Sequence, residues 1–568
     1  MRDELVQITK TADHWYKNAI IYCIDVETFL DSNGDGIGDL EGISQRIDYL
    51  AEIGVNCIWL MPFYPSPRRD NGYDVSDLYG VAARHGNHGD FVELVRVAHD
   101  RGMKLLVDLV INHTSDQHPW FQDALTSTNS RYRDYYVWRD TEPPDTSADA
   151  MFPDAEDGVW THDPGTDQWY MHHFLRSQPD LNTANPAVRS EIAKTMGFWL
   201  QLGVDGFRVD AVPFAINKHV EAAVDDHTFD EPHDYLRTLR RFLDRRVTGQ
   251  GAAVMLGEVN LPHEEQMKFF GGKTGDQLTM QFDFYTNQQL YLALARQDAA
   301  PLARALELRP IDLPRTSQYA TFLRNHDELT LDLLSEEERN EVLDAFAPEK
   351  DMRIFGRGLR RRLPGMFDGD LERLKMVYSL LFALPGTPVL FYGEEIGMGE
   401  NLAVPGREAV RTPMQWTPGK NGGFSTGDPQ NFTRAVTTGR FGPENVNVVG
   451  SLRDRNSLLR HIALLARRYR EFPELGWGDY TVIQTGVPGV FAHSAEWDGR
   501  QMVRLHNLGS EPCDVHFTVP AGEPGEFLVD VFNQEACELG ERCEAEVSLG
   551  RYGYRWMRVS DHGASQFL

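Results

Sequence analysis

Eight continuous apolar runs, separated by stretches of helical periodicity, mark the chain between residues 19 and 393. A continuous rather than alternating apolar run is typical of a strand buried on both faces. Eight such strands alternating with helices predict an α/β fold of the (β/α)8 TIM-barrel type, with its chemistry at the C-terminal ends of the strands. The runs are AIIYCI (19–24), CIWLMPF (57–63), KLLVDLVI (104–111), GFRVDAV (206–212), AVMLGEV (253–259), LTMQFDF (278–284), YATFLRN (319–325) and TPVLFYG (387–393).

Helix signals lie between these runs. Apolar residues at positions 91, 94, 95 and 98 follow the spacing of a helix with one buried face. Asn185 before Pro186 is typical of a helix N-cap and first turn. This pair predicts a helix that ends near Leu202 and leads into the fourth strand.

Two connections are too long for plain loops. Residues 113–182 predict a small inserted domain after the third strand, which leaves 1–112 and 183–477 for the catalytic barrel. Beyond 478 the pattern changes to short alternating runs with turn signals, and 478–568 predict a C-terminal antiparallel β-sandwich. The other long connection, 328–369, contains SEEER and RGLRRRL. We expect a solvated helical face for this charge, with a lid over the active site as the alternative.

Charge and composition narrow the classes of partner. Lys and Arg number 56 against 85 Asp and Glu, a net charge of −29 that disfavours nucleic acid and favours a neutral substrate. The N-terminal segment has no apolar signal-peptide core, and no apolar stretch predicts a membrane span. Five sparse cysteines predict free thiols, and we expect a cytoplasmic protein without a membrane partner. An oligomer is compatible with this composition.

Three acidic residues end strands of the predicted barrel: Asp210, Glu258 and Asp327. Carboxylates that converge at a barrel mouth suit glycosidic bond cleavage, in which one attacks the anomeric carbon and one protonates the leaving oxygen. Arg208 shares a strand face with Asp210, and we expect its guanidinium to keep Asp210 ionised, while Glu258 needs a raised pKa. From spacing alone, a glycosidase and a metal-dependent barrel enzyme are equal alternatives.

The chain resembles the α-amylase superfamily, glycoside hydrolase family 13, over about residues 15–568. Four motifs of that family occur in order: DLVINH (108–113), GFRVD (206–210), GEVN (257–260) and RNHD (324–327). The resemblance implies a retaining enzyme with Asp210 as nucleophile, Glu258 as general acid/base and Asp327 as the residue that grips the glucosyl hydroxyls. It also implies that His113 and His326 contact the same sugar ring.

A second set of matches concerns the closed end of the pocket. In exo-acting members of this family an Asp and an Arg form an ion pair that recognises the terminal glucose, and a Tyr stacks on it. The equivalents are Asp70 and Tyr73 in RDNGYD and Arg411 in VRTPMQW. The stretch QPDLN (178–182) resembles the mostly exo-acting oligo-1,6-glucosidase-like branch. We therefore expect a closed pocket for a small α-glucoside.

The loop DSNGDGIGD predicts a structural cation. Its oxygen ligands at alternate positions, with glycines between them, suit Ca2+ or Mg2+ and match the loop after strand one of this family. An Asx-rich turn without metal is the alternative, and no organic cofactor is expected. A second site would use Asn112 and Asp180. The ligands predicted for the first site are Asp31, Asn33, Asp35, Ile37 and Asp39.

Within the family, the chain looks most like the trehalose synthase branch. RNHDELTL (324–331), GEEIGMGEN (393–401) and VRTPMQWTP (410–418) carry this resemblance, which implies interconversion of maltose and trehalose by intramolecular glucosyl transfer. The stretch after Glu258, VNLPHEEQ, departs from that branch. An exo-acting α-glucosidase that passes glucose to water is therefore an alternative. A non-catalytic binding or structural subunit is a remote third, since such members lose the carboxylates.

Overall fold

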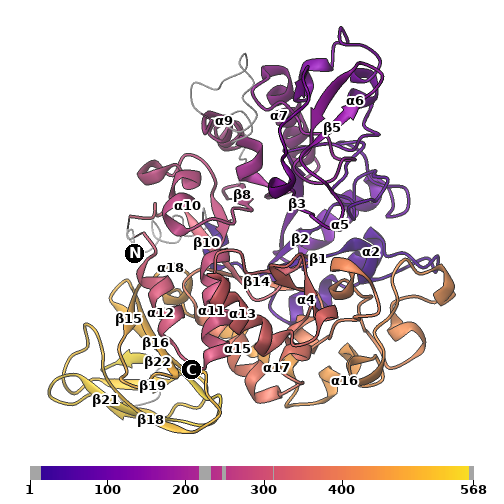
Figure 1. The fold of residues 1–568 in the computed structure, drawn as a ribbon. Helices are drawn as coiled ribbons and strands as arrows, with labels where there is room; N and C mark the ends of the chain where they lie inside the picture. The colour runs from indigo at the N-terminus through magenta and orange to yellow at the C-terminus, as the bar shows by residue number, and fades with distance from the viewer. Residues whose placement is uncertain (1–13, 217–231, 246–250, 311, 562–568) are drawn as a thin grey trace.

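A computed structural model describes residues 14–216, 232–245, 251–310 and 312–561 of the protein. Its centre is a closed barrel of eight parallel strands, which confirms the predicted (β/α)8 fold (Figure 1). All eight predicted runs form these strands. In the order in which they pair around the barrel, they are β1 (Ile21–Ile24), β2 (Cys57–Leu60), β3 (Lys104–Val110), β7 (Gly206–Asp210), β8 (Val254–Gly257), β9 (Met280–Phe282), β10 (Gln318–Phe322) and β14 (Thr387–Phe391).

Helices surround the barrel because each presents an apolar face to it. In α5 the buried residues are Phe91, Leu94, Val95 and Ala98, as the spacing predicts. Asn185 caps α7 by accepting the Ala187 N–H, which confirms the predicted helix start. The main helices are α5 (His88–Asp100), α7 (Pro186–Gln201), α9 (Asp234–Asp244), α10 (His263–Phe270), α11 (Phe284–Arg296), α12 (Ala300–Glu307), α15 (Leu371–Ala383) and α17 (Leu458–Glu471).

The long connection between β3 and β7 carries a small sheet of its own. Three antiparallel strands pair in the order β4 (Trp138–Arg139), β6 (Gln168–Met171) and β5 (Trp160–Asp163), beside α6 (Pro119–Ala124). A bridge between His113 and Asp180 joins the two ends of the connection. The segment projects from the barrel in Figure 1, where α6 and β5 lie at the upper right.

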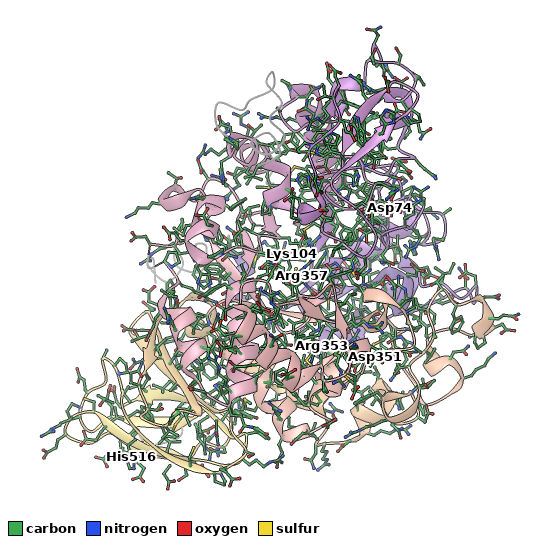
Figure 2. All side chains as sticks on the ribbon, in the orientation of Figure 1. Asp74, Lys104, Asp351, Arg353, Arg357 and His516 are labelled. Carbon is green, nitrogen blue, oxygen red and sulfur yellow. The ribbon has the colours of Figure 1, made fainter. Side chains whose placement is uncertain are left out.

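The connection after β10 forms a second small sheet, β11 (Leu329–Thr330), β13 (Gly358–Leu359) and β12 (Arg353–Ile354). Figure 2 labels Arg353 and Arg357 on the β12–β13 hairpin. The SEEER run opens α13 (Glu336–Phe346), where Ser335 and Glu338 form a capping box at the surface.

A solvated face is wrong for the second charged run of this connection. Arg360 and Arg362 are buried, and Arg361 pairs with Glu400 at 2.8 Å. Arg360 donates to the carbonyls of Leu402 and Val404, and Arg362 donates to that of Val410. These arginines therefore hold the loop that follows β14, instead of facing water.

The chain after residue 478 consists of antiparallel strands packed around a separate apolar cluster. They are β15 (Asp479–Ile483), β16 (Val490–Trp497), β17 (Arg500–Asn507), β18 (Cys513–Thr518), β19 (Phe527–Asp530), β20 (Ala536–Glu538), β21 (Glu544–Leu549) and β22 (Tyr554–Ser560). All five cysteines of the chain are free. Among the helices described, none has the length and apolar character to span a bilayer.

Candidate active site

A cavity of about 250 Å3 lies at the C-terminal ends of the barrel strands. All three predicted carboxylates line it, each from the end of a different strand. Asp70, Tyr73 and His113 line it as well. The structure thus brings residues that are up to 257 positions apart in the sequence, from Asp70 to Asp327, to one cavity.

Asp210 and Glu258 are held by one buried guanidinium. Arg208 Nη1 lies 2.5 Å from Asp210 Oδ1, and its Nη2 lies 2.9 Å from Glu258 Oε2. The same Nη1 contacts Asp108 at 2.7 Å, and Trp59 donates to the other oxygen of Asp108. The two carboxylates are held by the two terminal nitrogens of one guanidinium group and line the same cavity, as a double displacement requires.

The backbone after Asp210 also bears on Glu258. Ala211 N donates to Glu258 Oε2 at 3.1 Å. Ala211 adopts a left-handed conformation with φ of 48°, which is uncommon for a residue with a side chain. Strained backbone of this kind is often kept at functional sites, and here it turns the N–H that follows the candidate nucleophile toward the candidate acid/base.

The electrostatic balance at Asp210 differs from the expectation. Burial raises the pKa of Asp210 well above its usual value; Arg208 opposes the rise, and the charges of Glu258 and Asp108 add to it. Arg208 therefore acts in the expected direction but does not offset the effect of burial on the pKa of Asp210. The reason is that one guanidinium is shared among three carboxylates.

The pKa of Asp327 is lowered, in contrast to that of Asp210. Although burial alone would raise its pKa, His326, Arg407 and Arg411 hold it well below the usual value. His326 Nε2 lies 3.0 Å from Asp327 Oδ2 and 2.9 Å from Tyr73 Oη. A carboxylate whose pKa is held low suits a group that accepts hydrogen bonds from sugar hydroxyls.

The arginine that closes the pocket is not the one predicted. Arg407, rather than Arg411, pairs with Asp70 at 2.6 Å, and it also contacts Asp327. Arg411 is fully buried behind the wall, where it donates to the His326 carbonyl at 2.6 Å and to Asp327 at 3.0 Å. The short 3-10 turn η7 (Gly406–Val410) contains Arg407 and ends just before Arg411, and it is Arg407 that reaches Asp70.

His113 and Tyr73 stand at the same end of the cavity. Gln178 Nε2 lies 3.1 Å from His113 Nε2 and donates to Asp70 Oδ2 at 3.0 Å. Tyr73 is buried with its ring nearly parallel to that of His326, at an interplanar angle of 11°. The QPDLN stretch therefore supplies a buried side chain that holds two residues of the cavity wall, Asp70 and His113.

Sequence reasoning missed other polar residues that line the cavity, among them Asn260, Glu328 and Asp332. Asn260 Nδ2 donates to both oxygens of Asp332 at 3.0 Å, and Gln288 donates to Asp332 at 3.1 Å. Glu328 lies 3.6 Å from Arg357 of the β12–β13 hairpin. Asn260 belongs to the GEVN motif, and its position after a barrel strand could have indicated a place at the active site. Nothing in the sequence predicts its pairing with Asp332.

The predicted metal loop is organised by backbone contacts. Asp31 accepts the N–H groups of Asn33, Gly34 and Gly36, and Asp39 accepts that of Gly42. The oxygens of Asn33 and Asp35 accept the N–H groups of Asp35 and Ile37. Within the described ranges, no group of three or more His, Cys, Asp or Glu side chains is arranged to hold a metal ion.

These side-chain oxygens accept backbone N–H groups, which are the contacts of Asx turns. At the predicted second site, Asn112 Nδ2 donates to Asp180 Oδ1 at 3.0 Å, and His173 contacts the other oxygen of Asp180. Ca2+ or Mg2+ binding stays a prediction, and no chemical step is assigned to it.

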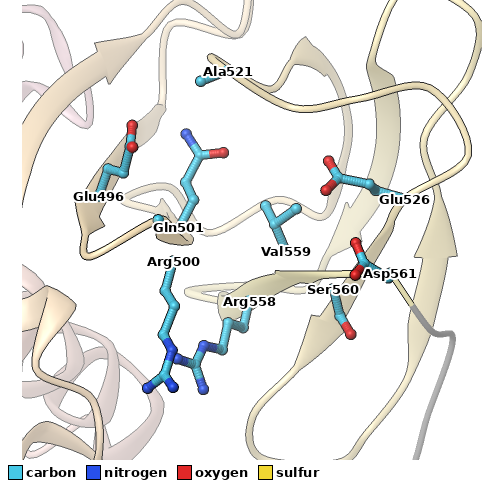
Figure 3. A pocket seen from close by; sticks show the side chains of 10 residues that line it. Glu496, Arg500, Gln501, Ala521, Glu526, Arg558, Val559, Ser560 and Asp561 are labelled. Carbon is cyan, nitrogen blue, oxygen red and sulfur yellow. The ribbon is translucent and has the colours of Figure 1, made fainter. Parts of the chain in front are cut away.

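A larger cavity, about 450 Å3, lies on the C-terminal sandwich. Figure 3 shows Arg500 and Arg558 extending toward the same side of it, with Glu526 and Asp561 across from them. Arg558 is engaged by the buried Glu474 at 2.6 Å. None of the catalytic candidates lines this cavity, so its size does not make it the active site.

Comparison with known proteins agrees with this geometry. The model of the α-amylase catalytic domain matches residues 23–345 and 360–478, and that of a sucrose hydrolase-like C-terminal domain matches 499–558. Trehalose synthase/amylase TreS of Mycobacterium tuberculosis is 38% identical over 554 residues, covering 96% of this chain and 91% of that protein. Oligo-1,6-glucosidase of Bacillus cereus is 29% identical over 560 residues, covering 88% and 92%.

Among solved structures, trehalulose synthase MutB superimposes with a TM-score of 0.76 at 27% identity, covering 96% of this chain and all of that one. The fold, the converging carboxylates and these matches lead to one conclusion. The chain belongs to the α-amylase family, glycoside hydrolase family 13, as an α-glucoside-active enzyme related to trehalose synthases and, more distantly, to α-glucosidases.

Proposed function

We propose that the protein interconverts maltose and trehalose by a retaining, intramolecular glucosyl transfer. The observation that carries this proposal is the cavity itself: Asp210 and Glu258 share Arg208, and Arg407 closes the same space by pairing with Asp70 and Asp327. A closed end beside the nucleophile fits a terminal glucosyl ring and leaves no path for a longer chain beyond it.

In the first half of the reaction, Asp210 attacks C1 of the non-reducing ring of maltose. The bond from C1 to O4 of the second glucose breaks, and Glu258 gives its proton to that oxygen. The products are a glucosyl ester on Asp210, a free glucose and an ionised Glu258. Asp327, held charged by Arg407 and Arg411, accepts hydrogen bonds from the hydroxyls of the ring that reacts.

In the second half, the free glucose turns over and presents its anomeric hydroxyl. Glu258 removes the proton of this hydroxyl, its oxygen attacks C1, and the ester bond to Asp210 breaks, which yields trehalose. Asn260, oriented by Asp332, lines the same cavity, and we assign it to the binding of the retained glucose. Water that enters first would take the same place and give two glucose molecules.

Two further observations support transfer over hydrolysis. The cavity is walled by aromatic rings as well as polar groups, which suits the retention of a sugar and the exclusion of water. These rings are Phe152, Phe174, Phe214 and Phe284. In addition, the relative at 38% identity is named a trehalose synthase, whereas the named glucosidase is at 29%.

Product analysis of the purified protein with maltose tests the proposal. We expect trehalose as the main early product and, when carbon-13 glucose is added, little label in that trehalose, because the released glucose stays in the site. Asp210→Asn and Glu258→Gln serve as matched controls for contaminating activity. Glucose as the sole product would contradict the transfer and establish an α-glucosidase instead.

A further inference from the structure

The tip of the β12–β13 hairpin contains an unusual residue for its backbone conformation. The turn from Ile354 to Arg357 has positive φ at both central residues, 54° at Phe355 and 65° at Gly356. Turns of this type favour Asn followed by Gly, because few side chains tolerate the left-handed region. Gly356 fits this preference and Phe355 does not, so the backbone alone gives no reason for a phenylalanine here.

The ring of Phe355 has a partner in the inserted domain. Its centroid lies 5.4 Å from that of Phe152, although the two residues are about 200 positions apart. Phe152 lines the active-site cavity, and the guanidinium of Arg407 lies 4.9 Å from its ring. The strained turn thus places an aromatic side chain against the wall that contains the pocket-closing arginine.

The residue after the turn makes a second contact with the same segment. Arg357 Nη2 donates to the carbonyl of Met151 at 2.9 Å and lies 3.6 Å from Glu328. Arg357 and Met151 both line the cavity, so this contact joins two parts of its wall. Phe355 and Arg357, on either side of Gly356, therefore contact the adjacent residues Phe152 and Met151 of the inserted segment.

We propose that Phe355 and Arg357, docked on Met151 and Phe152, form a latch that keeps the cavity closed while the glucosyl ester exists. The inference rests on the proposed function and adds the residues that set its specificity. Neither latch residue is placed at the reacting atoms, so both act by positioning. Closure limits the entry of water and of sugars longer than a disaccharide, and opening allows exchange of substrate and product.

The variant Phe355→Asn separates a latch from a merely structural role. Asn suits the left-handed position better than Phe, so we expect a melting temperature that is unchanged or higher. Loss of the ring should raise the glucose share of early products from maltose by about fivefold and raise activity on maltotriose relative to maltose. Gln534→Asn, at an exposed residue with φ of 63° in the C-terminal domain, is the matched control and should alter neither ratio.

Phe152→Leu removes the other half of the contact. We expect it to move both ratios in the same direction, and the double variant with Phe355→Asn should add little to either change. Unchanged ratios in Phe355→Asn, with wild-type protein that makes trehalose, would overturn the latch and leave the proposed function standing. If the wild type makes glucose alone, the proposed function fails. The ratio of activity on maltotriose to activity on maltose still tests the latch, because entry of the substrate into the cavity does not depend on whether water or glucose is the acceptor.

Discussion

The ion pair between Asp70 and Arg407 offers the sharpest quantitative prediction. Its two atoms are 2.6 Å apart, and the side chains are only 9% and 17% exposed. Two unit charges about 4 Å apart, measured between group centres, attract each other by about 4 kcal/mol at an effective dielectric constant of 20. Arg407 is shared with Asp327, so we assign about half of this, about 2 kcal/mol, to the contact with Asp70.

A double-mutant cycle measures that coupling. We expect the values of kcat/KM for p-nitrophenyl α-glucoside in Asp70→Ala, Arg407→Ala and the double variant to give a coupling of about 2 kcal/mol, or about 30-fold. The same cycle with Asp70→Ala and Arg411→Ala should give less than about 0.5 kcal/mol, because Arg411 binds Asp327 and the His326 carbonyl instead.

The comparison of the two cycles decides between the arginines. Both variants remove one buried positive charge near Asp327, so a general loss of charge would affect the two cycles alike. A larger coupling for Arg411 than for Arg407 would refute the assignment of the pocket-closing pair and would support the motif-based prediction.

Three further outcomes are expected. Asp31→Ala removes an acceptor of three backbone N–H groups, so we expect a loss of about 3 kcal/mol in the free energy of unfolding by urea. If the loop DSNGDGIGD binds a structural cation, EDTA should lower the melting temperature and leave turnover unchanged. An unaltered melting temperature would contradict cation binding. Burial raises the pKa of Glu394 from 4.5 to about 7, so the folded state favours the neutral side chain. This contribution to stability is fully present below pH 4.5 and is lost as the pH rises through about 7. Between pH 4.5 and 8, the free energy of unfolding measured with urea should therefore fall by about 3 kcal/mol less in Glu394→Gln than in the wild type. The same pH dependence in both proteins would exclude this linkage.

The barrel was predictable because its strands are buried on both faces and therefore read as continuous apolar runs. Local chemistry predicted α7 equally well, since the caps of a helix lie next to it in the sequence: Asn185 and Pro186 are adjacent, and Asn185 accepts the N–H of Ala187. The three strand-end carboxylates could be expected to meet for the same reason, because a barrel brings the C-terminal ends of its strands together.

Contacts made by loops were the part that sequence could not supply. Arg407 and Arg411 are four residues apart and chemically identical, and only the local fold, with Arg407 inside η7 and Arg411 just after it, decides which one reaches Asp70. The pairing of Asn260 with Asp332 and the approach of Phe355 to Phe152 depend on how two long connections fold over the barrel. Arg362 was expected in a solvated run and lies buried, because its hydrogen-bond partners are carbonyls 30 and 48 residues away.

The central claim is that residue 210 becomes covalently bonded to glucose. Purified protein treated with 5-fluoro-α-glucosyl fluoride, digested and sequenced by mass spectrometry measures this directly. We predict one added fluoroglucosyl group, located on Asp210, and none in the Asp210→Asn variant. A label on another carboxylate, or a reaction without any labelled peptide and with inverted anomeric configuration in the product, would contradict the account.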